Sequence, residues 1–99
     1  MTHVRIKDEA TGTESDLAAH GVFTCVGLAP NTGLSRTLVP VDAGGRIVVD
    51  AAMRTPERGV CAAGNVRHGS PHRVTGAMGD GAAAAAAIDR YLSTGEWRA

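Results

Sequence analysis

The side chains best placed to do chemistry lie between Gly59 and Gly81. A short apolar run, residues 59–64, is followed by a loop with four basic or titratable side chains, Arg67, His68, His72 and Arg73. Gly79-Asp80-Gly81 then precedes an alanine run, so the backbone N–H groups at a helix start there would be unshielded. A strand end, a polar loop and a bare helix N-terminus together predict a pocket for a large, partly anionic molecule.

Other reactive residues favour structural roles. Cys25 and Cys61 are far apart in apolar runs, which indicates inert core thiols rather than a redox couple. His68 and His72 are four residues apart, but Gly69 and Pro71 between them disfavour a helix, so we expect no metal site. Asp80 is expected to satisfy free N–H groups at the helix start, with a ligand contact as the alternative.

The elements that must position this loop can be read from local patterns. Val4 and Ile6 alternate with basic residues, which predicts a half-buried strand that returns after a turn as residues 14–17. The apolar run Gly21–Val26 predicts a central strand. A second hairpin is expected from residues 39–41 and 46–50 around the turn at 42–45, followed by a buried strand at 60–63.

Ala82–Leu92 is the clearest helix, with Ile88, Tyr91 and Leu92 on one face and Gly95 just past its end. The alanines indicate close helix packing as readily as a ligand role. The fold class is therefore α/β, or α+β for these 99 residues alone: β-hairpins, a buried strand and one C-terminal alanine-rich helix, forming an incomplete unit.

Composition narrows the classes of function. The 99 residues allow at most one modest core, and aromatic residues make up only 3% of them. The formal net charge is zero and the ten Lys and Arg residues are scattered, which argues against nucleic-acid binding. No apolar run reaches membrane-spanning length and no signal-peptide core is present, so we expect no membrane association and a cytoplasmic location.

Several ordered motifs resemble a known family. Ala62-Ala-Gly-Asn-Val-Arg67, followed after a loop by Gly-Asp-Gly-Ala-Ala-Ala-Ala, is similar to the C-terminal flavin-binding signature of thioredoxin reductases and related pyridine nucleotide-disulfide oxidoreductases. The segment Gly21–Thr32 is similar to the family's crossover from its NADPH-binding domain to its FAD-binding domain. Met53–Val60 is similar to the stretch that leads into the flavin strand.

The resemblance implies an incomplete FAD/NAD(P)-binding Rossmann-like unit. Residues 1–28 would be the tail end of the NADPH-binding domain, and residues 29–99 the C-terminal segment of the FAD-binding domain. The cofactor implied is FAD, with the NADPH site largely missing. Its contacts would be Gly64, Asn65, Val66, Arg67, His72, Arg73 and Val74. Asn65 stands where the family has an Asp that accepts a hydrogen bond from a ribityl hydroxyl, and a neutral acceptor is weaker.

The sequence lacks the family's glycine-rich nucleotide turns and its Cys-x-x-Cys pair. We therefore expect the C-terminal part of a thioredoxin reductase-like flavoprotein oxidoreductase that is not catalytic alone and is either completed by a complementary reductase polypeptide or a truncated relic. Two alternatives stay open. One is a non-enzymatic flavin- or nucleotide-binding module, and the other is an interaction fragment that self-associates through an open sheet edge.

Overall fold

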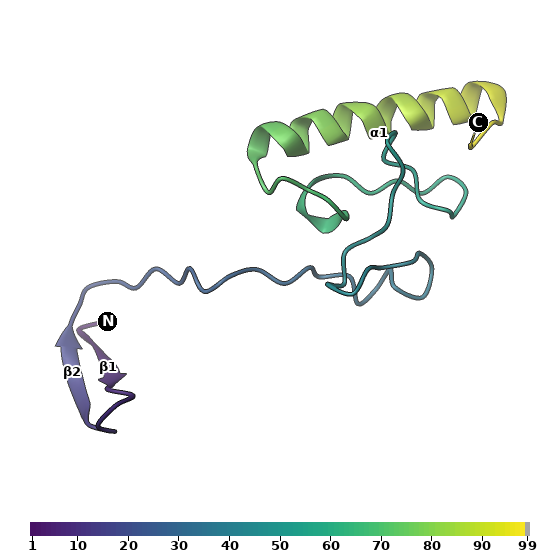
Figure 1. The fold of residues 1–99 in the computed structure, drawn as a ribbon. Helices are drawn as coiled ribbons and strands as arrows, with labels where there is room; N and C mark the ends of the chain where they lie inside the picture. The colour runs from purple at the N-terminus through teal and green to yellow at the C-terminus, as the bar shows by residue number, and fades with distance from the viewer. Residues whose placement is uncertain (99) are drawn as a thin grey trace.

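The computed structural model describes residues 1–98, which form an elongated molecule of 64 × 24 × 20 Å (Figure 1). An N-terminal hairpin lies far from a larger body, which we define as residues 29–98, and an extended stretch joins the two. The body carries the helix, the hydrophobic core and the loop between residues 64 and 73.

The hairpin consists of β1 (His3–Lys7) and β2 (Glu14–Ala18), paired antiparallel with Val4 opposite Leu17. Its turn is closed by the Asp8 carboxylate, which accepts from the Ala10 N–H at 2.8 Å, and Gly12 adopts a left-handed φ of 72°. The predicted hairpin is confirmed. Its apolar face is less covered than expected, since Leu17 is 55% exposed and only Val4 is partly buried.

The predicted central strand at Gly21–Val26 is wrong. Residues 21–28 are extended but unpaired, and Phe23 and Val26 are each 97% exposed. Cys25 is exposed too, so the expectation of a core thiol fails there. Residues with high strand propensity form a sheet only when they pair with a neighbouring strand. No backbone hydrogen bond joins residues 20–31 to the rest of the described chain, so this segment has no such neighbour.

The core of the body is formed by Val39, Ile47 and Ala62, with four partly buried valines packed against them. The predicted second hairpin is reduced to its turn and one antiparallel bridge, between Val41 and Ile47. The predicted strand at 60–63 is likewise reduced to one bridge, between Arg54 and Cys61. Prolines in both regions, Pro40 and Pro56, supply no N–H to a ladder, which shortens the pairing.

The helix α1 spans Val74–Thr94 and begins well before the predicted start at Ala82. It ends as predicted at Gly95, whose φ is 75° and whose N–H donates to the Tyr91 carbonyl at 2.8 Å. Ile88 and Tyr91 are partly buried, but Leu92 is 77% exposed, so the predicted apolar face is only partly correct. Across residues 1–98, no helix combines the length and hydropathy that crossing a membrane requires.

Candidate functional site

A groove of about 290 Å³ lies beside the loop that the sequence singled out. One wall is the extended segment Leu28–Asn31, where the connecting stretch enters the body. The opposite wall is formed by Asn65, Val66 and His72, and Arg46 completes the lining. The groove is mostly apolar with a few polar groups, which is the usual character of a small-molecule site.

Asn65 and Val66 are placed by a single turn of 3₁₀-helix, η1 (Gly64–Val66). Gly64 has a φ of 81°, a left-handed conformation that glycine adopts without steric cost. A Cβ built on Gly64 would lie 3.5 Å from the Ala77 methyl group, so the turn contacts α1 closely. The turn is further fixed by the Gly64 N–H, which donates to the Asp80 carboxylate at 3.0 Å.

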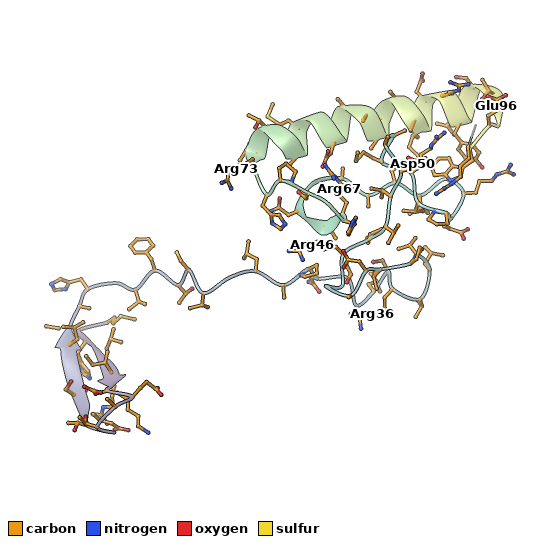
Figure 2. The ribbon with its side chains drawn as sticks, in the orientation of Figure 1. Arg36, Arg46, Asp50, Arg67, Arg73 and Glu96 are labelled. Carbon is orange, nitrogen blue, oxygen red and sulfur yellow. The ribbon has the colours of Figure 1, made fainter. Side chains whose placement is uncertain are left out.

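Asp80 holds the loop against the helix. Its two carboxylate oxygens accept from Arg67 Nε at 2.7 Å and from Arg67 Nη2 at 2.8 Å. Figure 2 shows Arg67 lying between the loop and α1. Because α1 begins at Val74, Asp80 lies in its second turn and is buried. The predicted role of Asp80 in satisfying N–H groups at the helix start is therefore wrong, and it pairs across the fold instead.

The ion pairs of the loop shift the pKa values of Asp80, Arg67 and Asp42. The Arg67 guanidinium, with help from the Gly64 N–H, holds the pKa of Asp80 below its usual value against the opposing effect of burial. The same pairing raises the pKa of Arg67. His68 Nδ1 lies 2.6 Å from an Asp42 oxygen, and this hydrogen bond is the main cause of a lowered Asp42 pKa.

The N-terminus of α1 directly follows the loop (Figure 1). Its capping residue, Arg73, provides no side-chain hydrogen bond, and the first turn contains no acidic residue. The first N–H groups of the helix therefore have no protein acceptor from these sources, and the helix dipole adds positive potential. His72, just before the cap, has a φ of 54° and lines the groove.

The structure brings three of the seven predicted contact residues into the groove: Asn65, Val66 and His72. The other four flank it. Gly64 is buried under Asp80, Arg67 pairs with Asp80, and Arg73 with Val74 forms the exposed helix start. Within residues 1–98 no group of three or more His, Cys, Asp and Glu side chains could hold a metal ion.

Sequence reasoning missed Arg46. It lines the groove, and its Nε atom is buried with no hydrogen-bond partner among the described residues. Buried N–H donors without an acceptor are rare in folded proteins. The one signal in the sequence was the position of Arg46, a long basic residue directly after the predicted turn at 42–45. Its side chain could be expected to contact whatever lies beside that turn.

The lowered pKa values of Asp42 and Asp80 predict acid sensitivity of the body. Between the folded and unfolded pKa values the unfolded chain binds more protons, so the free energy of unfolding rises with pH in that interval. The stabilisation is present above about pH 4 and is lost as the pH falls through the folded values. We expect the Tm from Trp97 fluorescence to be flat from about pH 5 to 7 and to drop below about pH 4. A Tm that stays constant down to about pH 2 would contradict this assignment.

Comparison with known proteins finds one matching family model and several similar proteins. Residues 2–81 match the model of the family described as pyridine nucleotide-disulphide oxidoreductase. The chain is 42% identical over 94 residues to thioredoxin reductase of Treponema pallidum (strain Nichols), covering 95% of this chain and 30% of that protein. It is 37% identical over 95 residues to a component of alkyl hydroperoxide reductase in Pseudomonas putida, covering 95% of this chain and 18% of that protein.

Solved structures give the same result. Thioredoxin reductase from Streptococcus pyogenes MGAS5005 superposes with a TM-score of 0.72 at 39% identity, over 94% of this chain and 30% of that one. Thioredoxin reductase of T. acidophilum gives a TM-score of 0.71 at 40% identity, over 94% and 31%. The chain thus spans about three tenths of the length of the thioredoxin reductases it matches.

Proposed function

Because the chain belongs to the pyridine nucleotide-disulphide oxidoreductase family, we propose that its groove holds part of the FAD of a thioredoxin reductase-like flavoprotein. The observation that carries the proposal is a groove lined by Asn65 and His72, with the uncapped start of α1 two residues beyond His72. The expected ligand is electron-rich along one edge and apolar along its faces, which matches both the groove lining and a flavin nucleotide.

The residues present fit such a group. The buried Nε of Arg46 has no acceptor within the described chain, and the first turn of α1 offers N–H groups without a carboxylate to compete for them. Both features suit a ligand that supplies acceptor oxygens. When bound, FAD supplies the electron-transfer chemistry of the family. The residues described here bind it and orient it.

Asn65 would accept a hydrogen bond from the ribityl chain through its amide oxygen, since the matching family residue is an acceptor. Arg73 and the N-terminus of α1 would place positive potential near the ligand, which favours an anionic form of the reduced flavin by about 0.3–1 kcal/mol. Val66 would pack against the ligand as part of the apolar lining.

The groove is at the lower end of the range of about 300–1,000 Å³ for ligand pockets, so it accommodates only part of a dinucleotide. We assign residues 1–28 to the NADPH-binding side and residues 29–99 to the FAD-binding side of the family fold. The separation of the hairpin from the body supports this division (Figure 1). The glycine-rich turns and the redox cysteine pair would come from polypeptide outside these 99 residues, and turnover would require that polypeptide.

A second candidate function is an interaction module. The specific observation in its favour is the extended segment 21–28, where Phe23, Val26 and Leu28 are 81–97% exposed and the backbone is unpaired. Such a segment can add to the edge of another sheet. Both candidates need a partner, but only the flavoprotein proposal requires flavin in the complex.

The test is co-expression with a polypeptide that carries the glycine-rich part of a thioredoxin reductase, followed by desalting and visible absorption spectroscopy. We expect a yellow complex. Asn65→Asp should retain flavin about ten-fold more tightly, because a charged acceptor is worth roughly 1.5–3 kcal/mol against about 0.5–1.5 for a neutral one.

Asn31→Asp is the matched control, since it adds the same charge to the opposite wall of the groove. It should leave flavin affinity unchanged or weaken it. A stable but colourless complex would overturn the flavoprotein proposal and favour the interaction module. Equal tightening by both variants would show that Asn65 has no particular role.

A further inference from the structure

Arg46 is held rigidly between the two walls of the groove. Its backbone N–H donates to the Asp42 carboxylate at 2.9 Å, and its carbonyl accepts from the Asp42 N–H at 2.7 Å. The next residue, Ile47, donates to the Val66 carbonyl at 2.9 Å, which fixes Arg46 relative to the turn that carries Asn65.

The other wall is fixed to the same segment. The preceding residue, Gly45, accepts a hydrogen bond from the Thr32 hydroxyl at 2.7 Å. A Cβ on Gly45 would lie 3.4 Å from Pro30, so the segment 28–31 approaches the backbone closely at this point. Arg46 therefore has its Cα set by contacts with both sides of the groove, and the base of its side chain has little freedom to leave.

The guanidinium of Arg46 differs from those of the other partly buried arginines. Arg54 donates to Asp50 at 2.9 Å and Arg67 donates to Asp80 at 2.7 Å, so each has a carboxylate partner. The Nε of Arg46 is buried without any hydrogen-bond partner in the described chain. The nearby Asp42 carboxylate is already engaged by the Arg46 N–H and by His68. Figure 2 shows Arg46 where the connecting stretch meets the body, beside the loop.

The geometry points to Arg46 as a ligand-binding residue of the groove, whose guanidinium donates to an acceptor oxygen of the bound flavin nucleotide. The inference rests on the proposed function for the identity of the ligand. The guanidinium has no carboxylate partner in the described chain, so a ligand oxygen at its accessible end would meet an unengaged charged donor. A hydrogen bond from such a donor is among the stronger ones. The oxygen is supplied by either the phosphate or the flavin ring, both of which carry acceptors.

The first experiment is NMR spectroscopy of the ¹⁵N-labelled chain in complex with the polypeptide that carries the glycine-rich part of a thioredoxin reductase, with and without FAD. We expect the Arg46 Nε–H signal to shift together with the backbone signals of Asn65 and Val66. Shifts at Asn65 and Val66 with no change at Arg46 Nε–H would overturn the inference and leave the proposed function intact. No shift at any of the three would overturn the proposed function, and the inference with it.

The second experiment uses Arg46→Met, which keeps an unbranched stem that reaches about as far as Nε and removes the guanidinium. It should weaken FAD binding about ten-fold or more while the Tm without ligand stays the same or rises, because an unpartnered buried donor has been removed. Arg36→Met, at an exposed arginine outside the groove, is the control and should change neither quantity. A fall in Tm with unchanged affinity would mean that Arg46 is structural and would refute the inference.

Riboflavin and FAD, titrated in parallel, separate the two sources of the oxygen. Equal weakening of both ligands by Arg46→Met would place the oxygen on the flavin ring or ribityl chain. Weakening of FAD alone would place it on the phosphate. If neither ligand is weakened, Arg46 donates to neither and the inference is wrong.

Discussion

Trp97→Ala is expected to destabilise the body by about 3–5 kcal/mol, the usual cost of truncating a buried tryptophan. Trp97 is 6% exposed although it lies two residues from the end of the chain. Its ring packs edge-on against Tyr91 with centroids 5.2 Å apart, and its Nε1–H donates to the Thr55 carbonyl at 2.9 Å. Its own carbonyl accepts from Arg54 Nη1 at 2.6 Å.

The loss would be large relative to the whole stability of a domain this small, which is on the order of 5–15 kcal/mol. The measurement is urea unfolding followed by far-UV circular dichroism, which reports α1 even when the only tryptophan is removed. Phe23→Ala is the matched control, since Phe23 is an aromatic residue that is 97% exposed. The control should unfold at the same urea concentration as the parent chain. Equal midpoints for Trp97→Ala and Phe23→Ala would refute the anchoring role of Trp97.

Local features of the fold could be predicted from the sequence because local interactions determine them. The hairpin at residues 3–18 needs only alternating side chains, an Asp that closes the turn and a glycine with positive φ. The end of α1 is also determined locally, by the positive φ of Gly95. The family resemblance is likewise supported by a match over residues 2–81.

The start of α1 was missed for a physical reason. Three glycines, Gly76, Gly79 and Gly81, lower the intrinsic helix propensity of the first turns. Packing explains one of them, since a Cβ on Gly76 would lie 2.5 Å from the Pro71 ring, too close for any other residue without movement. The glycine is thus required by the loop that crosses the helix start. That contact is local in sequence but depends on the turn at His72, whose φ of 54° is unusual for a residue other than glycine.

The site could be predicted only in part. Asn65, Val66 and His72, three of the seven predicted contact residues, line one groove, and flavin binding there stays a prediction. Arg46 and the wall at 28–31 were missed because the groove is formed by segments that are distant in sequence. The residues of the turn at 42–45 do not indicate which segment packs beside it. The strand at 21–26 was overpredicted for the related reason that a strand depends on partners elsewhere.

Asp80→Ala is expected to have the second large effect, through the turn that carries Asn65. The substitution leaves the Gly64 N–H, on a buried residue, without an acceptor, at a cost of about 1–3 kcal/mol, and it leaves the Arg67 guanidinium without its carboxylate. Both of the lost interactions join the segment around η1 to α1. We therefore expect a lower urea midpoint and, in the flavin-bearing complex, faster loss of flavin on desalting.

Asp89→Ala is the matched control, because Asp89 is an exposed aspartate on the same helix. It alters the helix charge equally and should leave both quantities near the parent values. Asp80→Asn separates charge from hydrogen bonding, since an amide oxygen still accepts from Gly64 but no longer pairs ionically with Arg67. An intermediate loss in Asp80→Asn, with a weaker dependence of Tm on pH below about pH 4, would show that ionic pairing and backbone satisfaction both fix the loop. If Asp80→Ala matched Asp89→Ala, the ion pair would have no part in positioning Asn65. The turn would then be held by its other contacts, such as the Ile47–Val66 hydrogen bond and the close approach of Gly64 to Ala77.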